Sequence, residues 1–282
     1  MFHPYQLMRT LEEASITTDI QKDRGVKRMN NNQATLKKLE TMRLYGMVRA
    51  FRATMETGVK HSFTPDELLS HLVDTEWDDR HNRKIERLIK AARFRNTVSF
   101  EEIDFGLDRN LDKNQLLRLS DCGWIERHQN LIFNGSTGTG KSFIAQALGH
   151  QGCLYGYKSG YYPCSKLFKH LQLCRADGSY LKELERIRKQ DLFLLDDMGL
   201  EPFDAPSRFS LLEILEDRIG RKSSIIVSQI PINKWHHVIG DPTIADAICD
   251  RIIHNSHRIE LKGESVRKIY ANRSVEQEGK EE

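Results

Sequence analysis

The sequence has few cysteines, and none of them form a C-x-x-C pair. Its five cysteines are scattered between residues 122 and 249, which gives no support for a zinc site or a thioredoxin-type redox motif. An odd number of widely spaced cysteines is typical of reduced thiols, so we expect a cytoplasmic protein. No apolar run is long enough to span a membrane, and the first residues lack the apolar segment of a signal peptide. The sequence therefore predicts no membrane partner.

An excess of charge of one sign is also missing. The chain has 43 Lys and Arg against 40 Asp and Glu, a net charge of +3. Such a balance does not by itself indicate a nucleic-acid-binding protein, so that inference must come from local clusters. The apolar content of 39% is enough to build a core, and 282 residues are enough for one or two domains.

One stretch carries a complete phosphate-binding motif. Residues 135–142 have the sequence GSTGTGKS, which matches G-x-x-x-x-G-K-[ST] at every fixed position. An apolar run at 131–133 precedes it and a helix-compatible run at 143–148 follows it, so a strand–loop–helix unit is predicted. Glycines let successive backbone N–H groups point at a phosphate, and the helix N-terminus adds partial positive charge. We predict nucleotide contacts from Gly135, Ser136, Thr137, Gly138, Thr139, Gly140, Lys141, Ser142 and Phe143.

A second apolar strand ends in two acids, Asp196 and Asp197. In a phosphate-loop protein, Asp196 and the Ser142 hydroxyl would hold Mg²⁺, and Asp197 would orient and deprotonate the attacking water. A later strand ends at Ser228 and Gln229, either of which would lie near the terminal phosphate if the two strands are neighbours. These residues predict hydrolysis of ATP with Mg²⁺.

The order of the segments predicts the fold class. Strand-like runs at 131–134, 159–162, 192–196 and 225–229 alternate with helical runs, which indicates an α/β domain with a parallel sheet. Helical periodicity dominates the part before it, including a first segment over 36–55, a helix opening at Pro65 and a third segment over 76–95. We predict four regions: a polar, disordered extension at 1–33, a helical domain at 34–121, an ATPase domain at 122–272 and a polar tail at 273–282. Within the extension, residues 1–28 are expected to be an upstream part of the reading frame or a loose tail.

The third helical segment is basic. Five of its residues fall three or four positions apart, hence on one helical face: Arg80, Arg83, Lys84, Arg87 and Lys90. A solvated face is the usual meaning of such a run, and contact with DNA or RNA is the alternative.

Several of these segments together resemble one family. They are the phosphate loop 135–142, the acid pair 196–197, the strand end 228–229, the stretch 245–268 and the helical start 39–47. They resemble the IstB family, AAA+ ATPases that help insertion-sequence transposases and are related to the DnaC-type helicase loaders. The resemblance covers about residues 30–270, and 245–268 is its most specific part.

The resemblance implies a fold and residue roles. It implies an AAA+ core in which residues 135–142 are the Walker A loop and 196–197 the Walker B pair. Ser228 or Gln229 would take the sensor 1 position, Arg251 would be an arginine finger that reaches a neighbour's ATP, and Arg267 would be sensor 2. With Lys141 and Asp197, Arg251 then completes the predicted catalytic set.

The resemblance also implies partners. Members assemble on duplex DNA into an ATP-dependent oligomer and recruit a cognate transposase, which favours the nucleic-acid interpretation of the basic segment. Asp197 departs from the Glu that many AAA+ proteins carry, so a nucleotide-bound scaffold with negligible turnover stays open. A replicative helicase loader is a second alternative. A small-molecule kinase is a third, and the acid pair and the 245–268 stretch speak against it.

Overall fold

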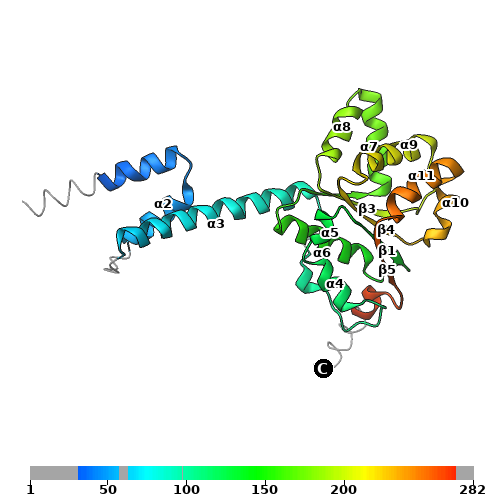
Figure 1. Ribbon diagram of the computed structural model, residues 1–282, viewed down its shortest axis with the longest axis horizontal. Coiled ribbons are helices and arrows are strands. Elements are labelled where there is room, and N and C mark those ends of the chain that lie inside the picture. The colour runs from blue at the N-terminus through cyan, green and yellow to red at the C-terminus, as the bar shows by residue number, and fades with distance from the viewer. Residues whose placement is uncertain (1–30, 57–62, 97, 271–282) are drawn as a thin grey trace, which may run out of the picture. The chain divides into compact units, whose positions relative to one another are not determined.

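The computed structural model describes residues 31–56, 63–96 and 98–270 (Figure 1). The predictions for residues 1–30 and for the tail 273–282 lie outside the described residues. The chain divides into two compact units, of which one ends at Lys84 and the other begins at Ile85. No helix within the three described ranges is long and apolar enough to cross a membrane.

The described part of the first unit is helical, as predicted from residue 34 onwards. Residues 31–33, which were predicted to belong to the disordered extension, are part of a helix over 31–41. α2 follows (Tyr45–Glu56), and α3 (Pro65–Ala92) begins in this unit. The helical spacing over 36–55 predicted one segment, but the structure breaks it at residues 42–44, where Arg43 has a φ of 59°. The break brings Gly46 against α3, where a Cβ on Gly46 would lie 2.6 Å from the Glu76 Cα. Because only glycine fits, the turn is determined by this contact between helices rather than by local periodicity.

The start of α3 follows from its capping residues. The Thr64 N–H donates to the Glu67 carboxylate (2.8 Å) and the Glu67 N–H donates to the Thr64 hydroxyl (3.3 Å), a reciprocal capping box. Pro65 takes the first helical position, where its missing N–H costs nothing. The predicted helices from Pro65 and over 76–95 are one helix of 28 residues.

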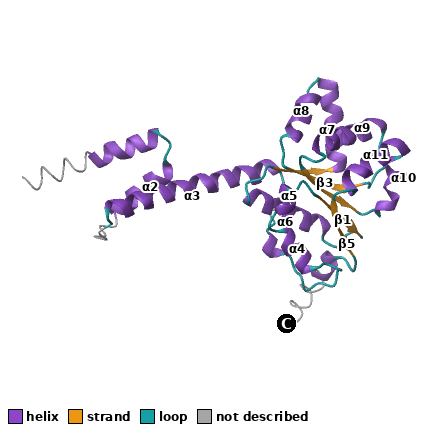
Figure 2. Ribbon diagram, in the orientation of Figure 1, coloured by secondary structure: helices purple, strands orange, loops and turns teal. Residues whose placement is uncertain are grey.

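The second unit is built on a five-stranded, all-parallel sheet with the strand order β2-β3-β4-β1-β5 (Figure 2). The strands are β1 (Asn130–Gly135), β2 (Ser159–Pro163), β3 (Leu192–Met198), β4 (Ser223–Ser228) and β5 (Ser256–Leu261). This topology confirms the predicted α/β class, and the first four strands match the predicted runs. β5 was not among them.

Helices cover both faces of this sheet (Figure 1). Leu131 and Phe133 pack towards one face, with α4 (Lys113–Leu119), α5 (Gly123–Glu126) and α6 (Lys141–Leu154). Ile132 packs towards the other face. The helices there are α7 (Cys164–Asp177), α8 (Tyr180–Arg188), α9 (Ala205–Arg218), α10 (Trp235–Ile239) and α11 (Pro242–Ile253). Burial on both faces explains why the central strands are continuous apolar runs.

Residues 98–121 pack with this sheet. Val98, Phe100 of the short 3₁₀ helix η1 (Phe100–Glu102), and Leu116 of α4 belong to the same apolar cluster as Leu131 and Phe133. These residues belong to the second unit, which begins at Ile85. The predicted boundary between a helical domain at 34–121 and an ATPase domain at 122–272 stays a prediction.

Candidate nucleotide-binding site

The predicted phosphate loop lies at the carboxyl end of β1 and leads into α6. Gly135, Gly138 and Gly140 have φ values of 139°, 84° and 91°, which favour glycine. Space is a second reason: a Cβ on Gly135 would lie 2.0 Å from the Leu261 carbonyl oxygen, and one on Gly138 would lie 2.3 Å from the Ser265 hydroxyl. The loop is therefore shaped by β5 and the segment after it, as well as by its own sequence.

Lys141 stands at the first position of α6 with only 5% of its surface exposed. Its ammonium group donates a hydrogen bond to the Ser136 carbonyl oxygen at 2.6 Å. Burial lowers the pKa of Lys141, and the charges of Asp197 and Asp196 oppose that shift. The charged lysine is thus held where an anion would be strongly favoured.

The predicted metal pair is assembled. The Ser142 hydroxyl donates to one oxygen of Asp196 at 2.8 Å, and the Tyr161 hydroxyl of β2 donates to the other at 2.7 Å. Burial raises the pKa of Asp196, and these two hydrogen bonds act in the opposite direction. The sequence gives no signal for Tyr161, because its contact with Asp196 depends on the β2–β3 register that pairs Tyr161 with Leu194. Ser142 and Asp196 offer hard oxygen ligands side by side, a donor set that suits Mg²⁺ with several retained waters.

Asp197 sits at a bulge in β3. The register with β4 shifts between Leu195 and Met198, and Asp197 has a φ of 60°. Bulges of this kind re-aim side chains beside functional sites, and here the Asp197 carboxylate lines the pocket next to the phosphate loop. Asp adopts the left-handed conformation several-fold more often than most residues. This backbone gives a physical reason for Asp at a position where a longer acid is common elsewhere.

The structure separates the two candidates at the end of β4. The Ser228 hydroxyl is fully buried, donates to the Met198 carbonyl oxygen at 2.8 Å and accepts from the Ile230 N–H. Gln229 lines the pocket, where its amide nitrogen donates to Asp197 (3.4 Å) and its amide oxygen accepts from the Thr137 hydroxyl. Gln229 is therefore the better placed of the two to meet a terminal phosphate, although Ser228 was predicted as a contact.

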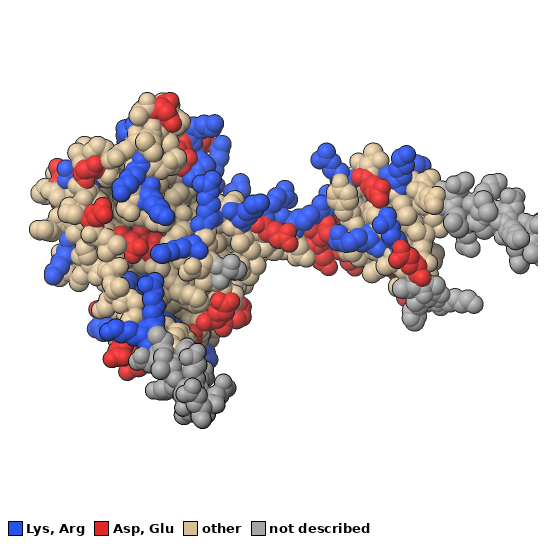
Figure 3. Space-filling model, turned by 180° about the vertical axis from the view of Figure 1, so that it is seen from behind, with Lys and Arg blue, Asp and Glu red and all other residues tan. Residues whose placement is uncertain are grey.

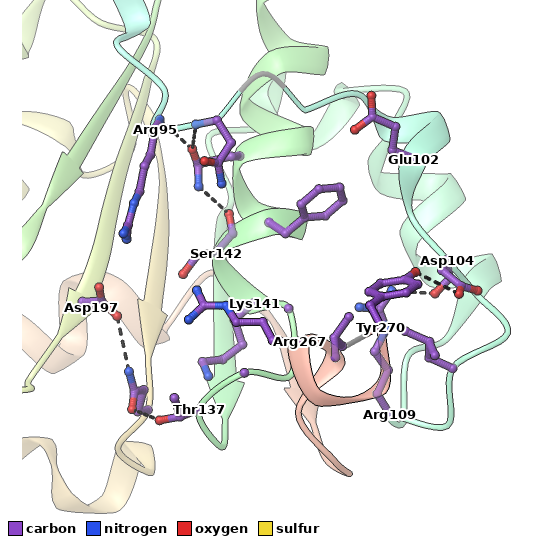
Figure 4. A pocket seen from close by; sticks show the side chains of 18 of the residues that line it. Arg95, Glu102, Asp104, Arg109, Thr137, Lys141, Ser142, Asp197, Arg267 and Tyr270 are labelled. Carbon is purple, nitrogen blue, oxygen red and sulfur yellow. Dashed lines mark hydrogen bonds between the residues drawn. The ribbon is translucent and has the colours of Figure 1, made fainter. Parts of the chain in front are cut away.

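A pocket of about 580 Å³ opens over the loop (Figure 4). That volume is typical of small-molecule sites. The predicted residues Phe143 and Arg267 line it, and the Val266 N–H donates to the Gly138 carbonyl oxygen at 2.9 Å, which ties the segment of Arg267 to the loop. One end of the pocket carries Asp197, and the other carries Asp104, which accepts a hydrogen bond from Tyr270.

Two arginines that were not predicted as nucleotide contacts, Arg95 and Arg109, also line this pocket. Arg109 is buried and donates to the backbone oxygens of Asp104 (2.6 Å) and Thr139 (3.4 Å), so it joins the segment before α4 to the phosphate loop. No local motif marks either residue. Both belong to the segment between α3 and α4, which precedes the strand–loop–helix unit in the sequence and packs against it.

Arg251, on α11, does not line this pocket. Its guanidinium donates to the Ala247 carbonyl oxygen at 2.9 Å and pairs with Glu216 at 3.3 Å. The Arg251 carbonyl oxygen accepts a hydrogen bond from Asn130, the first residue of β1. Arg251 therefore lies at the amino end of β1, whereas the loop lies at its carboxyl end, about 17 Å away for a strand of this length.

The basic residues of α3 are partly neutralised. Arg80 pairs with Glu76 (2.6 Å), and Arg83 pairs with Glu76 and Asp79 (3.7 and 2.5 Å). Figure 3 shows Lys and Arg gathered along one edge of this helix and acidic side chains along the other. One face of α3 is therefore lined with basic side chains, but Glu76 and Asp79 of the preceding turn reduce its positive charge.

No group of three or more His, Cys, Asp and Glu side chains that could hold a metal ion occurs in residues 31–56, 63–96 and 98–270.

A parallel sheet in this strand order, a phosphate loop after β1 and an acid pair at the end of β3 define an ATP-binding core of the AAA+ class. Its fold is similar to that of the DnaC helicase loader, with a TM-score of 0.50 and 19% identity over 61% of this chain and 100% of that one. At that identity the likeness is one of fold alone.

The chain belongs to the family of IstB-like ATP-binding proteins, whose pattern matches residues 35–274. It is 42% identical over 240 residues to the insertion sequence ATP-binding protein y4pL of Sinorhizobium fredii, which covers 85% of this chain and 98% of the relative. It is 37% identical over 200 residues to the ATP-binding protein of insertion sequence IS1162 of Pseudomonas fluorescens, covering 71% and 87%. The resemblance seen in the sequence is thereby confirmed.

Proposed function

We propose that this protein is an ATP-hydrolysing transposition helper, which assembles on duplex DNA and recruits a cognate transposase to the target. The observation that carries the proposal is the separation of Arg251 from the pocket of its own subunit. Its carbonyl oxygen accepts a hydrogen bond from the first residue of β1, so Arg251 lies beside the amino ends of the strands, and the loop lies at the carboxyl ends. The pocket has the phosphate loop and the two acids in place, but its candidate arginine finger lies at the opposite end of the strands. A site that is completed by the arginine of a neighbouring copy requires this arrangement.

Hydrolysis is supported by the arrangement of acids. Ser142 and Asp196 would hold Mg²⁺, which supplies charge neutralisation at the phosphates when bound. Asp197 lines the pocket beside Gln229, at hydrogen-bond distance from its amide, so the pair can hold a water for attack on the terminal phosphate. This arrangement favours turnover over a permanently bound nucleotide.

Asp197→Asn should leave ATP affinity within a few-fold of wild type and lower kcat by about a hundredfold or more, the scale of a lost general base. Asn also tolerates the left-handed backbone and keeps an oxygen for Gln229, so the fold should survive. Steady-state ATPase assays and nucleotide titrations measure the two effects. Asp217→Asn, at an exposed acid of α9, is the matched control. Undiminished turnover in Asp197→Asn would remove Asp197 as the base.

The DNA surface is proposed to include the basic face of α3. Arg80 and Arg83 are held by Glu76 and Asp79. Lys84 and Lys90 are exposed and enter none of the ion pairs formed within the described ranges, which leaves their charges available to phosphates. Of the five basic residues, Lys84 and Lys90 are therefore the two proposed to contact DNA phosphates.

Duplex binding by the wild-type protein should be tighter with ATP than with ADP and should fall steeply with salt. Each lost phosphate contact flattens the log–log salt slope by about 0.9, so Lys84→Ala with Lys90→Ala should reduce it by about 1.8. Fluorescence anisotropy on a labelled duplex at several salt concentrations tests this. The control pair is Lys169→Ala on α7 with Lys182→Ala on α8, two exposed lysines that enter none of the ion pairs found among the described residues. Equal duplex binding with ATP and ADP would contradict the proposed function. An unchanged salt slope in the double variant would contradict only the role of Lys84 and Lys90 in DNA contact.

Recruitment of a transposase is supported by relatives named for insertion sequences, which share up to 98% of their length with this chain. The similarity to the DnaC helicase loader reaches only the fold, so the loader function is not favoured. A transposase gene beside this reading frame, and its co-purification with the protein on duplex DNA with ATP, would support recruitment. Capture of a replicative helicase instead would contradict it.

A further inference from the structure

The segment directly after α3 is fixed to the nucleotide-binding core. The Phe94 ring packs against Tyr161, with ring centroids 6.5 Å apart. It also fills the space over α6 left by Gly149, where a Cβ would lie 2.9 Å from the Phe94 ring. Tyr161 in turn donates to Asp196. Phe94 thus packs on a side chain that touches the candidate magnesium site.

A buried glutamine makes the second attachment. Gln146 of α6 is only 1% exposed, and its amide oxygen accepts from the N–H groups of Arg95 (2.8 Å) and Asn96 (3.2 Å). Its amide nitrogen donates to the Ser142 carbonyl oxygen at 3.0 Å. A buried amide with these partners holds the backbone of Arg95 in a fixed position relative to the first turn of α6.

The side chain of Arg95 is exposed and lines the nucleotide pocket. Figure 4 shows it extending towards the end of the pocket that holds Asp197 and Ser142, away from the end that holds Asp104 and Tyr270. In a phosphate loop, the backbone surrounds the α- and β-phosphates, the lysine reaches the β- and γ-phosphates, and the serine meets the metal. The end with Ser142 and Asp197 is therefore where a γ-phosphate would lie.

We propose that Arg95 contacts the γ-phosphate of ATP bound in its own subunit, as a specificity-determining residue that distinguishes ATP from ADP. The inference rests on the proposed function, because it deepens the role of the same pocket. A guanidinium suits this task, since it stays charged and offers several donors to phosphate oxygens. Arg95 follows the last residue of α3, Ala92, by only three positions. A contact between Arg95 and the γ-phosphate would therefore act on the backbone three residues after the end of the basic helix.

Nucleotide affinities measured without DNA test the inference. Wild type and Arg95→Ala are titrated with ribose-labelled fluorescent ATP and ADP, with Mg²⁺ present. The variant should bind ATP about tenfold or more weaker, as for one lost charge-assisted hydrogen bond, and should bind ADP within about twofold of wild type. Arg95→Lys, which keeps the charge but not the fork of donors, should recover part of the ATP affinity. Arg118→Ala, at an exposed arginine of α4 away from the pocket, is the control.

A loss that is equal for ATP and ADP would overturn the inference, because it would place Arg95 elsewhere on the nucleotide. Unchanged affinities for both would also overturn it. A wild-type protein that binds ATP normally but shows no ATP-dependent duplex binding would contradict the proposed function and leave Arg95 to be judged by its own titration. A wild type that binds neither nucleotide would overturn both.

Discussion

Lys141→Ala is expected to weaken ATP binding by about a hundredfold or more. Lys141 is 5% exposed at the start of α6, and its ammonium group donates to the Ser136 carbonyl oxygen in the loop. Removing one partner of a buried charge pair costs about 2–5 kcal/mol, which corresponds to this range of affinity. No other lysine lines the pocket formed by the described residues, so a second ammonium group cannot replace it.

The Lys141→Ala variant should remain folded. Burial holds the pKa of Lys141 below its ordinary value, so the charged lysine carries a desolvation cost in the fold that the substitution removes. ATP at one hundred times its wild-type Kd should stabilise wild type by about 2.7 kcal/mol and the variant by far less. Nucleotide titration and thermal unfolding with and without ATP measure both effects, with Lys182→Ala as the control. Unchanged affinity would overturn the loop's role.

Local motifs account for what could be predicted in this site. The loop 135–142 and the acid pair 196–197 are contiguous in the sequence, and each requires particular residue types for a local reason: glycine at left-handed φ, and acids at the end of a buried strand. Strands buried on both faces are apolar runs, so β1, β3 and β4 could be predicted within two residues. The parallel topology followed from the alternation of strands and helices.

What escaped prediction depends on the register or on segments distant in the sequence. Tyr161 meets Asp196 only because β2 and β3 pair as they do, and Arg95 and Arg109 enter the pocket from the segment that packs over α6 and the loop. β5 is an edge strand with exposed Arg258 and Glu260, so it lacks the apolar run that marked the other strands. These relations are three-dimensional, and one sequence contains no local signal for them.

The choice between Ser228 and Gln229 illustrates the same limit. Both are polar residues at a strand end, but alternate residues of a strand point to opposite sides. The Ser228 hydroxyl bonds the backbone of β3, and the Gln229 amide meets Asp197. The structure thus assigns different surroundings to two residues that the sequence could not distinguish.

Arg251→Ala is expected to lower ATPase turnover by about a thousandfold, the lower end of the range for an arginine finger, with ATP affinity nearly unchanged. Arg251 lies at the amino end of β1, so its loss leaves the pocket of its own subunit intact. The guanidinium is bonded to Ala247 and Glu216, and its Nε has no hydrogen-bond partner among the described residues. Glu216 is largely exposed, so the ion pair with it costs little to break when a neighbour's phosphate approaches.

Mixing variants tests whether the arginine acts on a neighbour. An Arg251→Ala subunit keeps a complete pocket, and a Lys141→Ala subunit keeps its arginine, so a head-to-tail contact in the right order restores one working site. Random mixing of equal amounts creates this order at about a quarter of the contacts between subunits. Turnover per subunit should therefore rise well above that of either variant alone and should peak near equal ratios. Arg188→Ala, which breaks the ion pair between Arg188 and Glu185, is the control for loss of an arginine–glutamate pair. Absence of rescue at every ratio, in protein that still assembles, would assign Arg251 to its own subunit or to no catalytic role.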